Sequence, residues 1–343
     1  MRFIKYLKDS IIGNIKGPLR KVMFWKRFFN SYFYSNLIDI ARNPINTLNR
    51  SILKGKFKPK DCSIKIKKNV GFVKTSIKEI PELENSLDKL IKLLNEKDSI
   101  INSNYLKEDL KKKEAIKTYL IQSLEPSDLL NKNNEFIIKA ALSENLLWSI
   151  ADYTGWIPQI NLINLLIGKP NQNQFLETTQ LTHRDGGDAN HLHVFIYLKD
   201  IDKNDGATHI IGNKFSRFFP NNYQKVGLKY ALMRKINKIL NKLGKGLLIP
   251  NPENFIPLEG KKGDIIIFDA TNCPHYGGRT KKNGSRHILQ FHYTRFAPYS
   301  KSFVNGQLKN LDITKSYEIL ELSRRIAKTP LQQLAIPNYY ESR

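Results

Sequence analysis

Cysteine is scarce in this sequence, with two residues in a chain of 343. Cys62 and Cys273 are far apart and form no C-x-x-C motif, which excludes a disulfide framework and a cysteine-built zinc site. We therefore expect a reduced, intracellular protein.

Long apolar runs are also missing. A transmembrane helix needs roughly 20 consecutive apolar residues, and we find no such stretch. Near the start, Arg2, Lys5, Lys8 and Asp9 interrupt the apolar segment that a signal peptide requires. The sequence predicts no transmembrane segment, no secretion and a cytoplasmic location.

Acidic residues are few beside the basic ones, 31 Asp+Glu against 56 Lys+Arg, for a formal net charge of +25. Such an excess would suit a nucleic-acid partner, but lysine outnumbers arginine about three to one. Phosphate recognition usually relies on arginine with interleaved aromatic residues. Composition therefore does not favour nucleic acid, and an AT-rich coding bias explains the lysines at least as well.

The basic residues are concentrated in a first segment, residues 1–61, which is also rich in aromatic residues. Its amphipathic stretches, such as Met23 to Tyr34, would suit peripheral contact with an anionic membrane surface. The alternative, which we favour, is that the aromatic rings pack on the core while the lysines face water.

A mostly helical flank is expected over residues 62–156. Pro126 to Asp128 indicate a turn before one of its helices. A helical stripe is formed by Leu83, Leu87, Leu90, Leu93 and Leu94.

From residue 157 to about 300 the pattern changes to short β-like runs, which suit an all-β barrel or sandwich. A basic amphipathic helix, 225–245, interrupts them, and a helical C-terminal tail is expected over 301–343, with a helix from Ser316 to Ala327. The β-like runs are FLETTQLTH, HVFIYLKDI, ATHIIG, DIIIFD and HILQFHYTRF.

All seven histidines lie between positions 183 and 292, about a third of the chain, so the β region is where a site is expected. His183-Arg184-Asp185 forms an H-x-D motif, whose first and third residues share one face of an extended strand and can converge on a metal ion. His275 follows the buried run DIIIFD and precedes two glycines, and is our third candidate ligand.

Two histidines and one carboxylate form a facial triad, which leaves three adjacent positions open on an octahedral ion. That arrangement suits Fe(II), because a bidentate co-substrate and dioxygen can bind side by side, whereas zinc prefers tetrahedral closure. Arg286, eleven residues after His275, can clamp the distal carboxylate of a 2-oxo diacid.

The order of H-x-D, about 90 residues, a Gly-Asp turn into a strand, H-x-G-G and an arginine eleven residues later resembles the phytanoyl-CoA dioxygenase family of Fe(II)/2-oxoglutarate-dependent dioxygenases. The stretch DIDKNDGATHIIGNKFSR is also similar to that family's segment between the ligands. It departs at Gly212-Asn213-Lys214, where the family has a Pro-Gly-Ser-His-like turn.

The resemblance implies a double-stranded β-helix, or jelly roll, with flanking helices. It implies iron ligands at His183, Asp185 and His275, and a 2-oxoglutarate carboxylate bound by Arg286. Because Asp185 is present, the implied reaction is hydroxylation of an unactivated C–H bond with dioxygen, rather than halogenation.

Secondary candidates lie near the co-substrate. His193 and Phe195 would line the pocket if they alternate inward, and Thr208 could donate to a co-substrate carboxylate. His191 and His193 could instead be ordinary polar residues of a strand, and His209, His287 and His292 are expected to make local hydrogen bonds.

We expect a small-molecule substrate, an anionic one if the positive charge is functional, including a lipid- or glycan-linked intermediate. Two alternatives stay open. One is a nucleic-acid demethylase of the same chemistry, although His292 stands where such enzymes that resemble AlkB carry a second arginine. The other is a non-catalytic β-barrel binding protein that kept the scaffold.

Overall fold

The computed structural model describes residues 54–55, 62–105, 120–170, 178–180, 182–185, 190–213, 254–295 and 313–337. The predictions for the basic N-terminal segment and for the helix over 225–245 therefore lie outside the described residues, apart from 54–55. In the described part of the chain, no helix is long and apolar enough to cross a membrane.

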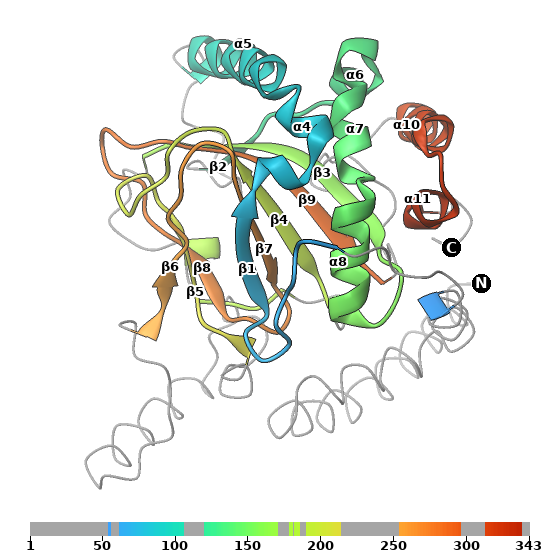
Figure 1. Ribbon diagram of the computed structural model, residues 1–343. Coiled ribbons are helices and arrows are strands. Elements are labelled where there is room, and N and C mark those ends of the chain that lie inside the picture. Colours follow the sequence, from blue (N-terminus) through green and yellow to red (C-terminus); the bar gives the residue numbers. More distant parts are fainter. Residues whose placement is uncertain are drawn as a thin grey trace, which may run out of the picture.

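Two antiparallel sheets form the centre of the described structure (Figure 1). The larger sheet has six described strands, and each pairs antiparallel with its neighbours. In spatial order they are β1 (Phe72–Ser76), β7 (Asp264–Asp269), β4 (Leu192–Tyr197), β9 (Arg286–Thr294), β3 (Gln159–Gly168) and β2 (Leu120–Gln122). The smaller sheet has the order β6 (Ile256–Pro257), β5 (Thr208–Ile210) and β8 (His275–Gly277).

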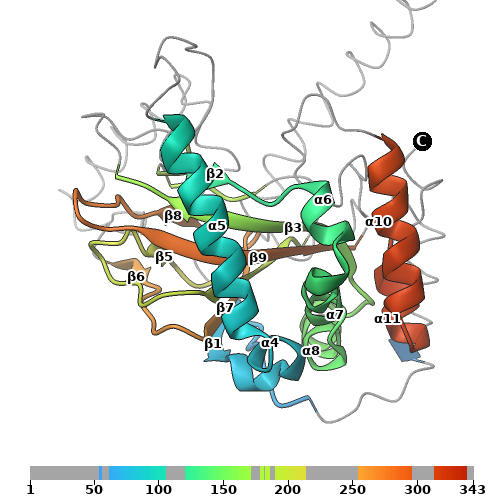
Figure 2. The same ribbon diagram turned by 90° about the horizontal axis from the view of Figure 1, so that it is seen from above.

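Helices cover one side of the larger sheet, and the smaller sheet lies on the other, as the view from above shows (Figure 2). Most of the described helices precede the strands that carry the histidines, and two follow them. The α-helices are α4 (Pro81–Glu84), α5 (Leu87–Tyr105), α6 (Pro126–Leu130), α7 (Glu135–Ala141), α8 (Glu144–Thr154), α10 (Ile313–Ile326) and α11 (Pro330–Ala335). The 3-10 helices are η1 (Ile77–Glu79), η2 (Lys132–Asn134) and η3 (Thr178–Gln180).

The alternation of side chains along the strands divides the core into two clusters. On β7, Ile265 and Ile267 belong to a cluster shared with the helices, whereas Ile266 and Phe268 belong to a second cluster on the opposite face. The second cluster includes Ala207 and other residues of the smaller sheet and its loops. Runs such as DIIIFD are apolar on both faces because both faces of the strand are covered.

Most of the expected strands are present, and DIIIFD is β7 itself. The expectation for FLETTQLTH is wrong where the structure describes it, because residues 178–180 form the 3-10 helix η3. The flank also contains strands β1 and β2, so it is less purely helical than expected. In this flank, Pro126 begins α6 and Asp128 accepts a hydrogen bond from the backbone of Glu125, as expected of a helix start.

Candidate metal centre

His183 and His275 are brought together by backbone pairing. The N–H of each donates to the C=O of the other, at 2.9 Å in both directions, and this isolated antiparallel bridge places the imidazole centroids 4.4 Å apart. Their backbones are 92 residues apart in the chain, so the bridge is what converts two distant histidines into one site.

Asp185 joins the pair from the same segment. Its backbone N–H donates to the carbonyl of Ala270 at 2.9 Å, which ties the segment to the end of β7. Residues 182–185 lie outside the named strands, so the shared face of the H-x-D motif arises from these two backbone contacts rather than from a regular strand. One ligand atom from each of His183, Asp185 and His275 lies within 4.8 Å of the others, which fits a single metal ion.

The protonation of His275 suits a ligand. Its Nδ1 lies 3.0 Å from the carbonyl oxygen of Cys273, which only accepts, so Nδ1 carries the proton and the neutral ring presents the Nε2 lone pair. Burial, and then the nearby charge of His183, lower the pKa of His275 to about 3. The imidazole is therefore neutral near pH 7, as metal binding requires.

Asp185 is ionised in this setting. Burial alone would raise its pKa, but the close contact with His193 and the charges of the surrounding imidazoles outweigh burial and hold the pKa well below its usual value. Its side chain keeps 25% exposure while that of His183 keeps 7%, so the carboxylate lies on the accessible side of the centre. The donor set of two imidazoles and one carboxylate fits a divalent first-row metal ion.

Arg286, the first residue of β9, is held at the other end of the same inner face. Its Nη1 donates to the carbonyl of Gly206 at 2.7 Å and to Oγ1 of Thr208 at 3.2 Å. Thr208 thus contacts the arginine, and its own contact with a co-substrate stays a prediction.

The smaller sheet brings the guanidinium near the ligands. A Cβ placed on Gly277 would lie 3.7 Å from Nη2 of Arg286. His275 and Gly277 are two residues apart on β8 and share a face, about 6.6 Å apart along the strand. The lack of a side chain at Gly277 leaves space between the ligand end of β8 and the guanidinium.

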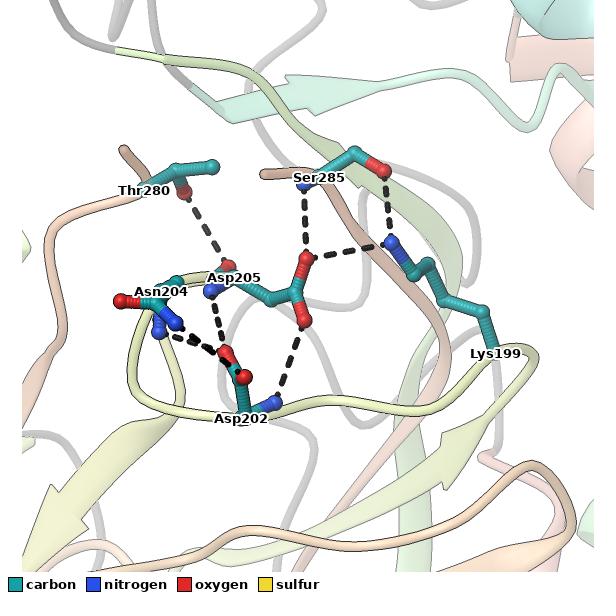
Figure 3. A network of polar contacts seen from close by, with 6 residues as sticks. All are labelled: Lys199, Asp202, Asn204, Asp205, Thr280 and Ser285. Atoms are coloured by element: carbon teal, nitrogen blue, oxygen red, sulfur yellow. Dashed lines mark hydrogen bonds and ion pairs between the residues drawn. The ribbon is translucent and has the colours of Figure 1, made fainter. Parts of the chain in front are cut away.

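A loop network fixes the backbone that holds Arg286 (Figure 3). Asp205 accepts hydrogen bonds from the N–H of Ser285 at 3.0 Å and from the ammonium of Lys199 at 3.1 Å. The hydroxyl of Thr280 donates to the backbone carbonyl of Asp205 at 3.2 Å. The network therefore joins the loop that ends at Gly206 to the residue that precedes Arg286.

His193 and Phe195 share the inner face of β4, the arrangement on which the sequence-based expectation depended. His193 lies 2.9 Å from Asp185 through Nε2 and Oδ2, and Phe195 is packed in the second apolar cluster. Whether either contacts a co-substrate stays a prediction.

His292 departs from expectation. It was expected to make a local hydrogen bond, but its Nδ1 lies 3.1 Å from Nε2 of His191, 101 residues away, and its ring stacks on His193. The available signal was the alternation along β9, which puts positions 286 and 292 on one face. His209, in contrast, makes the expected local contact, with the carbonyl of Ala207 at 2.9 Å.

No protein-family model matches the chain, and no curated protein matches it. The resemblance to phytanoyl-CoA dioxygenases therefore has no support from a family model.

Among solved structures, the chain is similar to the non-heme alpha ketoglutarate dependent epimerase SnoN from nogalamycin biosynthesis, with 13% identity over 66% of this chain and 79% of that one, at a TM-score of 0.40. It is also similar to HygX from Streptomyces hygroscopicus, solved with nickel and 2-oxoglutarate, with 16% identity over 66% and 86% and a TM-score of 0.39. AviO1 from Streptomyces viridochromogenes is 15% identical over 66% and 90%, with a TM-score of 0.38. At these scores the likenesses carry no functional argument, which depends instead on the residues of the candidate metal centre.

Proposed function

We propose that this chain is an Fe(II)- and 2-oxoglutarate-dependent oxygenase with a double-stranded β-helix core of the phytanoyl-CoA dioxygenase type. His183, Asp185 and His275 would hold the iron, and Arg286 would bind the distal carboxylate of 2-oxoglutarate. Bound there, ferrous iron supplies the activation of dioxygen and the attack on an unactivated C–H bond. The protein would position both partners among largely buried side chains.

The observation that carries the proposal is the convergence of three buried or half-buried ligands beside an anchored guanidinium. The three ligand atoms lie within 4.8 Å of one another. Arg286 reaches the same strand, β8, two residues beyond His275. A five-carbon 2-oxo diacid that chelates a metal through its keto acid end would present its far carboxylate in that direction. A site for a metal alone would not require the arginine.

The substrate we propose is a small metabolite or a lipid- or glycan-linked intermediate, hydroxylated at carbon. An anionic group on it, or peripheral contact with a membrane, would be recognised by the basic segments 1–61 and 225–245, which composition alone suggests. The proposed anionic substrate and the membrane contact depend on the charge of the sequence and not on the geometry of the described residues.

Anaerobic titration with Fe(II) and then 2-oxoglutarate tests the assignment. Chelation of ferrous iron by a 2-oxo acid produces visible absorption, so we expect a band that needs both components and is lost in His183→Ala. Admission of oxygen should then release succinate. A wild-type protein that shows no band contradicts the assignment, whereas a band without succinate favours the non-catalytic binding protein.

Arg286→Gln separates the co-substrate site from the metal site. A charge-assisted hydrogen bond contributes about 1.5–3 kcal/mol, so 2-oxoglutarate affinity should fall about 10–100-fold while metal affinity stays within about threefold. Calorimetric titration of the metal-loaded protein measures the affinity for 2-oxoglutarate. Arg286→Lys keeps the positive charge but cannot donate two parallel hydrogen bonds to a carboxylate, and should show an intermediate loss of affinity. Unchanged affinity in Arg286→Gln would remove the arginine from the proposed site.

A further inference from the structure

Three histidines outside the proposed ligand set form a cluster beside Asp185. His191 and His193 lie two residues apart at the start of β4, and His292 is the direct cross-strand partner of His193 on β9. One ring nitrogen from each lies within 4.8 Å of the others. Three buried or half-buried imidazoles beside a metal centre call for a physical role.

The geometry argues against a second metal ion in this cluster. An ion bound to an imidazole nitrogen lies close to the plane of that ring. The rings of His193 and His292 are stacked, with planes 10° apart and centroids at 3.7 Å, so no single ion lies near both planes unless one ring turns. The cluster is better explained by the contact that His193 makes with Asp185.

His193 and His183 face different oxygens of Asp185. Nε2 of His193 lies 2.9 Å from Oδ2, and Nε2 of His183 lies 3.6 Å from Oδ1. The contact of His193 with Oδ2 is a close polar contact between a ring nitrogen and a carboxylate oxygen, and not an aligned hydrogen bond. Oδ2 therefore faces His193, whereas Oδ1 faces His183.

The ring of His193 is held on several sides. It stacks on His292, and the ring of Phe268 meets it edge-on with centroids 5.1 Å apart. His292 is itself linked to His191 at 3.1 Å. The His193 ring that contacts Asp185 is thus held in place by packing.

We propose that His193 is a positioning residue that engages Oδ2 of Asp185, so that this carboxylate binds the metal through Oδ1 alone. The inference rests on the proposed metal centre. A carboxylate that binds through one oxygen uses one coordination position and leaves another for the co-substrate or dioxygen. His191 and His292 act through His193 by holding its ring.

Co(II) binding to the full chain without oxygen tests the inference, because visible absorption of Co(II) reports both affinity and coordination. His193→Phe keeps the ring but removes the donor, and should weaken Co(II) binding about 10–100-fold and change the spectrum. His193→Gln, which returns an N–H donor near the same place, should restore affinity to within about threefold of wild type, with a wild-type spectrum. His209→Phe is the matched control, since His209 pairs with Tyr276 away from the centre, and should leave both unchanged.

Several outcomes overturn the inference. Wild-type affinity and spectrum in His193→Phe would show that the polar contact with Oδ2 does not matter. A His193→Gln protein as weak as His193→Phe would show that a polar N–H group at this position is not what counts. If the wild-type chain binds two Co(II) ions and His292→Phe loses one of them, the histidine cluster is a second metal site and the positioning role of His193 is refuted. If His193→Phe does not fold by circular dichroism, His193→Met takes its place. A wild type that binds no Co(II), or a His275→Ala variant that binds it equally well, refutes the proposed metal centre itself.

Discussion

At the scale of single residues, the site depends on which atoms are already engaged by the protein. Nδ1 of His275 is committed to the carbonyl of Cys273, and Nη1 of Arg286 to Gly206 and Thr208. Nε2 of His275 is thereby left to meet a metal ion, and Nη2 of Arg286 lies beside Gly277, two residues further along β8. The side chains are oriented before any ligand arrives, which lowers the cost of binding.

Gly277 gives a residue-scale prediction. A methyl group there would lie 3.5 Å from the carbonyl oxygen of Thr179 and 3.7 Å from Nη2 of Arg286, so alanine fits without a clash and fills space beside the guanidinium. One extra carbon in a pocket changes affinity about 10–200-fold, and we expect 2-oxoglutarate to bind Gly277→Ala at least tenfold more weakly. Calorimetry measures this, and metal affinity, which should not change, is the internal control. Equal co-substrate affinity would mean that the carboxylate lies elsewhere.

The three candidate ligands that the structure brings together could be selected from sequence because they lie in short local patterns. His183 and Asp185 are two positions apart, and His275 and Arg286 are the first residues of the successive strands β8 and β9. The stacking of His193 on His292 was not predicted, because it depends on the register of β4 against β9, which no local pattern states.

At the scale of elements, the network around Asp205 holds two distant segments together. Asp205 and Lys199 come from the loop after β4, and Ser285 comes from the turn before β9. The carboxylate is partly buried, with 16% of its side chain exposed, so these contacts are shielded from water more than an ordinary surface pair. Since Gly206 follows directly, the network also positions the carbonyl that accepts from Arg286.

Asp205→Asn should destabilise the protein in a pH-dependent way. Burial alone would raise the pKa of Asp205, but the hydrogen bonds from Ser285 and Lys199 outweigh it and lower the pKa. A lowered pKa stabilises the fold above the unfolded value of about 3.9, and this contribution is lost as pH falls through the folded value. We expect a loss of about 1–2 kcal/mol at pH 7 in urea unfolding, and a smaller difference from wild type near pH 3.

Asp200→Asn is the matched control for that experiment. Asp200 pairs with Lys261 in the same region, but their side chains are 61% and 82% exposed, so the pair should contribute little to stability. If the two variants lose equal stability at pH 7, the Asp205 network has no special role.

The strands of the larger sheet differ in how well the sequence predicts them. The strand β7 was predictable because four residues of strong β propensity, Ile265 to Phe268, follow Gly263-Asp264. The strand β2 was not, since its three residues follow a lysine-rich, helix-favouring stretch and become a strand through pairing with β3. Tertiary contact overrides local preference there.

At the scale of the whole molecule, the two faces of the larger sheet have different neighbours: helices pack on one, and the candidate metal centre lies on the other. On β7, Ile265 and Ile267 pack with the helices, and Asp269 accepts a hydrogen bond from Tyr153 of α8 on the same side. The opposite face carries His193, His292 and Arg286 together with the apolar residues of the second cluster. Across the strands, Phe268 pairs with His193. Two residues further along the same face, Ile266 pairs with Phe195, and these two form the next row of side chains. That row lies between the histidines and the arginine along the strands.

Neighbouring isoleucines on β7 provide a matched test of this division. Ile266 and Ile267 are both fully buried and adjacent in sequence, but Ile266 faces the side of the candidate metal centre and Ile267 faces the helices. Replacing either with valine removes one methyl group and should cost about 0.5–1.5 kcal/mol of unfolding free energy, measured in urea. Only Ile266→Val should also change 2-oxoglutarate affinity, by about threefold or more, because its lost methyl group lies in the row of Phe195. Equal effects of the two variants on co-substrate binding would mean that the sheet does not divide the molecule in this way, and that the co-substrate does not lie along the inner face.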